Sequence, residues 1–387
     1  MYILFKGIYD TTDLYTDEII ACFKEHGIPY HVLNYETMGE DLEALPSPPY
    51  TVITFNNIGY NMGTEEGENL WDALGATFIN VIMDHPFHYM DKLRNLPKNS
   101  ILLCIDKNHV DFVHRFIPEI KDVRFEPHFG CVYCCDRGDG SGDCYESPEP
   151  SPRSSRDIDV LYAGSLSRVL IEQLIPDFND YPEIDGVDFS QRVLTRLISE
   201  PEKTTEEVIE EELDCEGVLR YIEGFRFLDG FAVSYFRELA VRILVENGIK
   251  VHVLGLGWET LDWADNSNLI HLGKCDAPEV LSYMKRSKIV LNTLTWFKDG
   301  AHDRIFNGML CGAAVVTDGS KYLDENVENI TTFNLKKLNG LPQNVNDLLI
   351  DEKKLSDITS KARKEAEESH TVENFLKDLG ILPKINI

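Results

Sequence analysis

Short apolar runs alternate with helical patterns along most of this chain, and that alternation is the strongest constraint on its fold. The runs that we predict to be strands are 2–8, 30–33, 50–55, 78–83, 101–105, 158–164, 250–254, 289–292 and 313–317. The segments that we predict to be helices between them include 17–26, 66–74, 277–285 and 303–310. Because parallel strands are joined by crossovers, usually helices, the pattern predicts an α/β fold with parallel sheets covered on both faces.

One segment, 138–156, interrupts this rhythm with Gly, Ser, Pro and charged residues and almost nothing apolar to bury. We interpret it as a linker, since 387 residues exceed the usual size of a single core. The sequence therefore predicts two Rossmann-like, doubly wound domains facing a cleft, with ligands bound beyond the carboxyl ends of the strands. The expected domains are 1–150 and 156–365, the second with a helical insertion at about 168–247, followed by a C-terminal helix at 366–387 that packs back toward the first domain.

The charge balance restricts the possible partners. With 37 basic and 66 acidic residues the formal net charge is −29, which repels nucleic acid and anionic lipid headgroups. An anionic ligand must then be captured locally, by backbone N–H groups, a helix dipole and one or two fixed cations. We interpret the acidic cluster of Glu206, Glu207, Glu210, Glu211 and Glu212 as a solvated helix face.

The N-terminus turns acidic too early for a signal peptide, and no apolar run approaches the roughly 18 residues of a membrane span. We therefore expect a cytoplasmic protein without a membrane span. Nine cysteines do not fit a disulfide framework, so reduced thiols are expected. The cluster of Cys131, Cys134, Cys135 and Cys144 begins with zinc-knuckle spacing but lacks a matching second pair, so free thiols in a loop are the preferred interpretation.

The segment 291–318 carries the clearest chemistry, because it reads as strand, loop, helix, glycine stop and strand. Its loop 298–302 leads into a helix whose first turn contains Arg304, so amide N–H groups and a guanidinium could converge on one anion. Arg304 can offer a bidentate fork to phosphate oxygens, and His302 can donate a hydrogen bond or a partial charge beside it. The alternative is that both are surface groups of an ordinary capped helix.

The segments 291–318 and 362–379 resemble the C-terminal domain of group 1, family 4-like glycosyltransferases of the GT-B fold. Within that group they look most like the branch related to the spore maturation protein CgeB. The pattern of the branch is a strand, His-x-Arg, a helix with Phe and Gly six residues apart, and an apolar strand. Its members here are His302, Arg304, Phe306, Gly312 and 314–317.

Two further segments carry the resemblance, which covers most of 156–380. The segment 156–167, with Gly164 and Ser165, looks like the start of the family's second domain, where a glycine turn approaches the diphosphate. The segment 251–259 resembles the part that packs beside the nucleotide base. Its characteristic residues are Gly255, Gly257 and Trp258.

Group 1 enzymes also carry a Glu-x7-Glu pair, and its positions fall on Asp299 and Asn307. The asparagine departs from the charged pattern, although its amide can still hydrogen-bond a ribose hydroxyl. The full donor site implied by the resemblance consists of Gly164, Ser165, Gly255, Gly257, Trp258, Asp299, Gly300, Ala301, His302, Arg304, Ile305 and Asn307.

The resemblance implies a hexosyltransferase that moves a sugar from a nucleoside diphosphate sugar, with a UDP-sugar as the expected donor. No other cofactor and no metal is expected. Arg304, His302 and the helix N-terminus would stabilise the departing diphosphate while the sugar carbon becomes oxocarbenium-like. The acceptor stays open between a glycan, a protein and a small molecule, and so does the oligomeric state.

The acceptor side and a general base are expected in the N-terminal domain. Asp13 follows the first strand, and Asp84, His85 and His88 follow the strand 78–83. The alternative is that these residues only cap and turn their loops, as Asp and Pro often do. A metal held by the second group is disfavoured because its histidines lack a helical i, i+4 spacing. His128 is a third candidate.

Two other functions remain open. The first is a noncatalytic nucleotide- or sugar-binding module, which the unusual Asn307 would fit. The second is a sugar-nucleotide epimerase of the same fold, which would need no acceptor.

Overall fold

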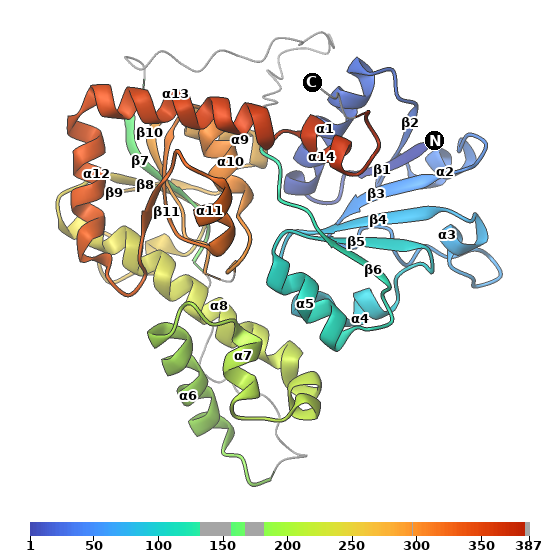
Figure 1. Cartoon of the computed structure of the whole chain (residues 1–387), viewed down its shortest axis with the longest axis horizontal. Coiled ribbons are helices and arrows are strands. Elements are labelled where there is room, and N and C mark those ends of the chain that lie inside the picture. The colour runs from blue at the N-terminus through green and yellow to red at the C-terminus, as the bar shows by residue number, and fades with distance from the viewer. Residues whose placement is uncertain (132–155, 167–181, 296, 384–387) are drawn as a thin grey trace. The chain divides into compact units, whose positions relative to one another are not determined.

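The apolar runs of the first half of the chain form one parallel sheet (Figure 1). The computed structural model describes residues 1–131, 156–166, 182–295 and 297–383. Within the described part, the strands lie in the order β2-β1-β3-β4-β5-β6, and every neighbouring pair is parallel. Their bounds are β1 (Tyr2–Lys6), β2 (Tyr30–Asn34), β3 (Thr51–Phe55), β4 (Thr77–Ile82), β5 (Ser100–Cys104) and β6 (Asp122–Phe125).

Helices connect these strands, as a parallel sheet requires. They are α1 (Asp10–Glu25), α2 (Met38–Glu43), α3 (Leu70–Ala73), η1 (Pro86–Tyr89), α4 (Met90–Arg94) and α5 (Lys107–Phe116). The helix predicted at 17–26 in fact begins at Asp10, with Asp10 and Asp13 in its first turn. Acidic side chains are favourable at that position because they face the positive end of the helix dipole.

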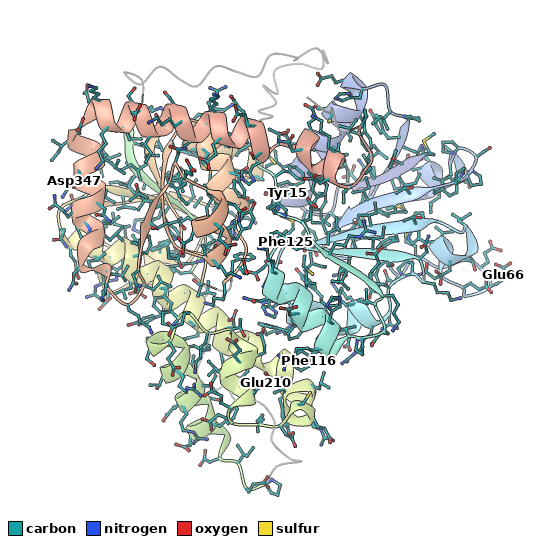
Figure 2. The ribbon with its side chains drawn as sticks, in the orientation of Figure 1. Tyr15, Glu66, Phe116, Phe125, Glu210 and Asp347 are labelled. Atoms are coloured by element: carbon teal, nitrogen blue, oxygen red, sulfur yellow. The ribbon has the colours of Figure 1, made fainter. Side chains whose placement is uncertain are left out.

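The chain divides into two units, and the helix α14 (Val372–Asp378) belongs to the first. The first unit consists of Met1–Pro148, Asp276–Pro278 and Glu367–Ile387. Phe375 of α14 packs on Phe129 with ring centroids 5.0 Å apart, and Phe129 lies 5.4 Å from Tyr15 of α1. Tyr15 is labelled in Figure 2. The last helix therefore supplies part of the aromatic core of the first unit.

The second unit, Glu149–Cys275 with Glu279–Ala366, is built on a second parallel sheet. Its described strands lie in the order β12-β11-β10-β7-β8-β9, again with parallel neighbours. Their bounds are β7 (Ile158–Ala163), β8 (Val251–Leu254), β9 (Leu269–Gly273), β10 (Ser287–Leu291), β11 (Ala314–Asp318) and β12 (Thr331–Phe333). The prediction of an α/β fold with two parallel sheets is confirmed.

The helices of the second half of the chain include one that is much longer than the others, α8 (Cys215–Glu246). Leu244 of α8 and Trp258 pack with the strand residues Val160, Leu291 and Val316 in one buried core. The remaining helices are α6 (Gly186–Ser199), α7 (Thr205–Glu210), η4 (Trp258–Thr260), α9 (Ala277–Arg286), α10 (Asp303–Leu310), α11 (Lys321–Asn326), η5 (Leu338–Gly340), α12 (Leu341–Ile350) and α13 (Glu352–Ser369). None of the helices that the structure describes combines the length and apolarity needed to cross a bilayer.

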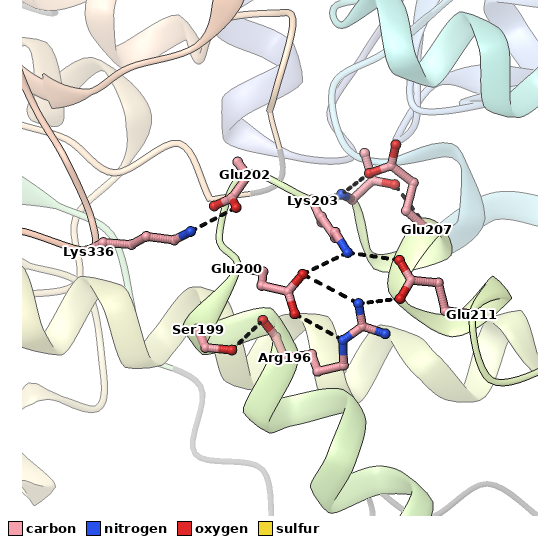
Figure 3. A network of polar contacts seen from close by, with 9 residues as sticks. Arg196, Ser199, Glu200, Glu202, Lys203, Glu207, Glu211 and Lys336 are labelled. Atoms are coloured by element: carbon pink, nitrogen blue, oxygen red, sulfur yellow. Dashed lines mark hydrogen bonds and ion pairs between the residues drawn. The ribbon is translucent and has the colours of Figure 1, made fainter.

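The helices α6 and α7 pack on α8, and an ion-pair network beside them includes Glu211 of the predicted acidic cluster (Figure 3). Lys203 lies 2.7 Å from Glu200 and 2.8 Å from Glu211, and Arg196 pairs with the same two carboxylates. Glu206 departs from the expected solvated face, because it is only 4% exposed. Such pairs at the surface contribute little individually to stability.

Candidate functional site

The loops that follow β7 and β8 are joined to each other by hydrogen bonds. Gly164 N donates to Leu254 O at 2.9 Å, and Leu166 N donates to Leu256 O at 2.8 Å. Leu256 N in turn donates to the Ser165 hydroxyl at 3.1 Å. The two loops therefore form one backbone surface at the carboxyl edge of the sheet, which is where open α/β sheets bind ligands.

Two glycines make this close approach possible. Gly255 has φ 114°, and a Cβ there would lie 2.7 Å from the carbonyl carbon of Gly164. Gly257 has φ 95°, and its Cβ would lie 2.3 Å from Leu166 O. Both conformations are left-handed and both positions lack room for a side chain, so only glycine fits.

Trp258 supports the same surface from inside the core. Its ring is fully buried, packs edge-on against Tyr162 at 5.5 Å, and donates its Nε1 hydrogen to Gly164 O at 2.8 Å. A ring enclosed in this way offers no face to a nucleotide base. The placement favours a structural role for Trp258, that of positioning Gly164.

The helix α10 begins beside this surface, with His302 as its N-cap residue. Nη2 of Arg304 lies 2.6 Å from Nε2 of His302, while Nδ1 of His302 faces the Asp303 carboxylate. A guanidinium can only donate, so Nε2 of His302 is the acceptor of this contact. Nδ1 lies close both to the Asp303 carboxylate and, at 3.3 Å, to the backbone N of Arg304. His302 is therefore neutral in this arrangement.

The environment of His302 favours the same neutral form. Burial, together with the charge of Arg304, lowers the pKa of His302 to about 4. We expected this ring to donate a hydrogen bond or a partial charge to a ligand, but both of its nitrogens are engaged by Asp303 and Arg304. Its position instead suits the orientation of the Arg304 guanidinium.

A second guanidinium, from Arg237 of α8, also lies beside the loop that follows β7. Its Nη1 donates to Ser165 O at 2.8 Å. A Cβ built on Gly164 would lie 3.4 Å from Nη1 of Arg304 and 3.8 Å from Cζ of Arg237. Two positive charges therefore flank the glycine turn and the N-terminus of α10, in a chain whose net charge is −29.

Sequence reasoning missed Arg237, and no local motif marks it. It reaches the site from the side of a long helix, 72 positions after its partner Ser165. Arg304 is further held by Asn292 at the end of β10, whose Oδ1 accepts from its Nη1 at 3.4 Å. The Asn292 amide donates to the Thr317 hydroxyl at 3.1 Å, so the fork of Arg304 rests on two strands of the sheet.

Several residues expected to touch the ligand are instead part of the framework of α10. Asn307 is only 4% exposed and donates its amide to Asp303 at 2.9 Å. Ala301 and Ile305 are buried in the core. These three buried side chains therefore stabilise the start of α10.

The loop before α10 is tied to the loop after β11. An ion pair joins Asp299 to Lys321 with an Oδ2 to Nζ distance of 3.3 Å. Gly300 O accepts from the Ser320 hydroxyl at 2.6 Å. The predicted residues Asp299 and Gly300 therefore lie beside the helix start, held from the side of β11.

In the first unit, the two carboxylates proposed as bases lie at the carboxyl ends of different strands. Both oxygens of Asp13 accept from Gly7 N at 3.0 Å, and burial raises the pKa of Asp13. Asp84 accepts through Oδ2 from the Tyr89 hydroxyl at 2.6 Å and from the Asn56 amide at 3.3 Å. Asp13 thus fixes its own loop, whereas Asp84 is oriented by side chains.

The histidines proposed beside them are enclosed. His85 is 2% exposed, caps η1 through an Nδ1 acceptor 3.3 Å from Phe87 N, and packs against His109 at 4.4 Å. His128 is 4% exposed and packs against Tyr15 at 4.5 Å. Both placements favour structural roles, because a buried imidazole ring cannot contact the substrate that accepts the sugar.

Over the ranges that the structure describes, no group of three or more His, Cys, Asp or Glu side chains is arranged to hold a metal ion. Cys131 is buried in the first unit. Cys134, Cys135 and Cys144 lie outside the described residues, as does most of the segment interpreted as a linker.

One protein family matches part of this chain. Residues 237–379 match a family described as "Glycosyl transferase-like". The match begins at Arg237 and includes α10 with His302 and Arg304. No curated protein sequence matches the chain.

Solved structures show the same architecture. An alpha-glucosyltransferase (AGT) solved in complex with UDP aligns with 98% of this chain and 98% of its own, at 10% identity and a TM-score of 0.55. An alpha-glucosyltransferase in complex with UDP and a 13-mer DNA aligns with 98% of this chain and 98% of its own, at 10% identity and a TM-score of 0.53. The likeness identifies the fold of this chain as the two-domain GT-B fold.

Two further structures are more distant. Anabaena HepE in complex with UDP and glucose aligns with 98% of each chain, at 11% identity and a TM-score of 0.47. TarM aligns with 86% of this chain, at 13% identity and a TM-score of 0.44. The alignment covers 54% of TarM, so this chain spans about half the length of that protein.

Proposed function

We propose that this chain is a glycosyltransferase that binds a UDP-sugar at the N-terminus of α10 and transfers the sugar to an acceptor. The observation that carries the proposal is the convergence of Arg237 and Arg304 on the Gly164 turn. The match of residues 237–379 to a glycosyl transferase-like family supports the reaction class. AGT, whose fold this chain shares, is described as binding UDP, which supports the choice of nucleotide.

The proposed chemistry is stabilisation of the leaving UDP. Negative charge grows on the diphosphate as the glycosidic bond to the sugar breaks, and preorganised cations in a partly dry site stabilise that charge strongly. Arg304 and Arg237 supply two fixed guanidiniums, and α10 supplies its positive end. Neutral His302 keeps the Arg304 fork oriented, so that little reorganisation is needed during the reaction.

Two fixed guanidiniums also offer a physical basis for metal independence, which we propose for this enzyme. A divalent ion and a pair of arginines perform the same task here, neutralisation of the departing diphosphate. The donor would be the only small molecule required besides the acceptor.

The uracil base and the sugar of the bound donor would lie on either side of its two phosphates. Leu256, between the two glycines, is 53% exposed and offers an apolar surface to the uracil ring that the buried Trp258 does not. Asp299, beside the start of α10, is the candidate for hydroxyls of the sugar. The backbone N–H of Ser165 would face the diphosphate.

For the acceptor we propose Asp84 ahead of Asp13 as the general base. Both oxygens of Asp13 are bound to one backbone amide, whereas the hydrogen bonds described for Asp84 all reach Oδ2. A glycan, a protein and a small molecule all remain possible acceptors.

The test is binding and turnover of nucleotide sugars by the wild type and Arg304→Ala. We expect UDP to bind more tightly than GDP, TDP and CDP in calorimetry, and we expect UDP release from UDP-sugars that Arg304→Ala abolishes. Arg242→Ala is the matched control, because Arg242 lies on α8 but pairs with Glu246. UDP release at the same rate from wild type and Arg304→Ala would remove Arg304 from the mechanism.

A noncatalytic nucleotide-binding module is the second candidate, favoured by one observation. Asn307 occupies a position that is acidic in the related enzymes, and its amide is committed to Asp303. This alternative predicts UDP binding of normal strength and no UDP release with any sugar donor. An epimerase would instead yield an altered UDP-sugar without free UDP, which product analysis detects.

A further inference from the structure

The second unit contains a cavity of about 920 Å³ whose described lining includes none of the residues assigned to the donor site, although its lining residues Lys321 and Ser320 bind Asp299 and Gly300 of that site. It lies at the carboxyl ends of β11 and β12, and the segment of Pro201 and Glu202 before α7 closes one side. The loop after β10 forms another wall, through Thr295 and Lys298. Gly164, Arg237, His302 and Arg304 are not part of its described lining.

Thr295 in the wall of this cavity has an unusual backbone. Its φ of 49° is rare for a β-branched residue, and strained backbone of this kind concentrates at functional sites. Asp318 holds the conformation by accepting from Leu294 N at 2.6 Å and Thr295 N at 3.5 Å, and Lys298 binds the carbonyl of Thr295. The loop is therefore fixed from two directions.

The side chain of Thr295 provides a second, independent observation. The residue is 6% exposed, and among the described groups nothing donates to or accepts from its buried hydroxyl. Buried hydroxyls in folded proteins almost always have a partner. A ligand in the cavity would supply one once rotation of the Thr295 side chain turns the hydroxyl toward it.

The cations that line the cavity already have partners. Lys336 lies 2.8 Å from Glu202 (Figure 3), and Lys321 lies 3.3 Å from Asp299. Lys298 donates to the Pro201 carbonyl at 2.5 Å as well as to Thr295. Two of these lysines are paired with carboxylates, whereas Lys298 binds two neutral carbonyl groups and lies near the Asp318 carboxylate. The lining also contains more carboxylates than lysines, so the cavity has no excess of cations with which to hold an anion.

The rest of the cavity lining combines carboxylates with aromatic side chains. Asp324 and Glu325 add acceptors and exclude an anionic ligand further, while Phe297 and Phe333 add aromatic carbon. Hydroxyl groups both donate and accept, so a polyhydroxylated molecule satisfies such a lining without burying a net charge. A volume of about 920 Å³ also falls within the range of small-molecule sites.

From these observations we propose that this cavity binds a neutral saccharide, at a site distinct from the donor site. The proposal goes beyond the proposed function, because it requires only the cavity and its lining. The saccharide is recognised by hydrogen bonds to the Thr295 hydroxyl and the charged groups of the rim, with its carbon face against the phenylalanines.

The experiment uses the full chain saturated with UDP, with glucose, N-acetylglucosamine and maltotriose as probes and inorganic phosphate as the charged comparison. Saturation-transfer NMR and calorimetry report binding. We expect saturable binding of at least one of the three saccharides, with phosphate unable to displace it. No saturable binding of any of the three, or displacement by phosphate, overturns the proposal.

Variants locate the site. Thr332 is an exposed lining residue on β12, which lies at an edge of the described sheet, so Thr332→Trp can fill the cavity without entering the core. We expect Thr332→Trp to weaken saccharide binding about tenfold or more and to leave UDP affinity within about twofold, whereas Thr332→Ser preserves both. Thr295→Gly relieves the left-handed conformation and removes the hydroxyl, so it should weaken saccharide binding in a stable protein. Saccharide affinity unchanged in both Thr332→Trp and Thr295→Gly overturns the assignment.

The two proposals fail in different ways. Arg304→Ala should weaken UDP binding about 10- to 100-fold and retain saccharide binding, which separates the sites. Absence of UDP binding in the wild type with saccharide binding intact would contradict the proposed function alone. UDP release with no saccharide binding would contradict the cavity assignment alone.

Discussion

Nη2 of Arg304 lies 2.6 Å from Nε2 of His302, across the first turn of α10. This contact makes the histidine an acceptor and keeps it neutral, so the pair carries a single positive charge that belongs to the guanidinium. Because the imidazole and Asn292 hold the fork from two sides, Arg304 is oriented before any ligand arrives. An anion bound at Arg304 would therefore contact hydrogen-bond donors that are already in position.

Arg304→Ala should weaken UDP binding about 10- to 100-fold, because hydrogen bonds to a charged group contribute roughly 1.5–3 kcal/mol. Arg304→Lys should recover only part of this affinity, since an ammonium lacks the planar fork. Titration calorimetry at fixed ionic strength measures both. Full recovery with lysine would mean that charge alone, and not the geometry set by His302, is what the site uses.

Arg237→Ala should also weaken UDP binding by about tenfold, because Arg237 flanks the Gly164 turn from α8. Arg242→Ala removes a charge from the same helix and should have no effect beyond the general change in net charge. Comparison of the two by calorimetry isolates the local contribution. Equal losses in both variants would contradict a role for Arg237 in the site.

Gly257→Ala should destabilise the second unit far more than Gly273→Ala. Both glycines have positive φ, 95° and 77°, but the added Cβ meets Leu166 O at 2.3 Å at position 257 and nothing within 4 Å at position 273. Strain alone costs about 1 kcal/mol, and the overlap raises the cost to roughly 2–4 kcal/mol. Urea unfolding gives the difference, and similar midpoints for the two variants would show that the β7 and β8 loops can separate freely.

The strands that the sequence failed to predict occupy sheet edges. β6, β9 and β12 each have a single neighbour in the described sheets. Each exposes much of its surface, and β12 has only three residues. β6 and β12 lack the apolar run that identified the central strands, because an edge strand faces water on one side. β9 contains three apolar residues, Leu269, Ile270 and Leu272, and was missed although they are visible in the sequence.

Some residues of the candidate site can be recognised from the local sequence, whereas others come from distant parts of the chain. His302 and Arg304 belong to one turn, so their spacing is visible in the sequence. Arg237 joins them only through the packing of α8 against the sheet, which residue spacing does not reveal. His85 is an example of the opposite error. Its residue type and its loop position suggested a general base, but the structure buries its side chain.

Asp318 should produce a measurable pH dependence of stability. Burial raises the pKa of Asp318 from 3.8 to about 6, against the opposing effect of the Leu294 amide. The folded state therefore holds this proton more tightly, so the stabilising contribution is complete below pH 3.8 and is lost as the pH rises through 6.

Asp318→Asn should remove that slope, which amounts to about 2–3 kcal/mol across the window. Asp324→Asn is the control, because Asp324 is an exposed carboxylate on the neighbouring α11. Denaturant midpoints between pH 4 and 8 supply the comparison. A wild-type slope that persists in Asp318→Asn would place the responsible group elsewhere.

Asp84→Asn should lower the rate of sugar transfer about 100-fold or more while UDP affinity stays unchanged, as loss of a general base requires. Asp13→Asn should instead loosen the loop held through Gly7 and lower stability, with a smaller effect on rate. Release of UDP under saturating donor, followed across pH, distinguishes the two. A larger rate effect for Asp13→Asn would reverse their roles.

The aromatic contact between Phe129 and Phe375, together with the 2.8 Å hydrogen bond from Gly130 N to His370 O, has a consequence for synthesis on the ribosome. Residues 367–387 are translated after the whole second unit, yet they complete the core of the first. The first unit must therefore wait, with Phe129 uncovered, until the rest of the chain has emerged. A nascent chain stalled before position 367 should show this as chaperone binding that disappears once α14 is made.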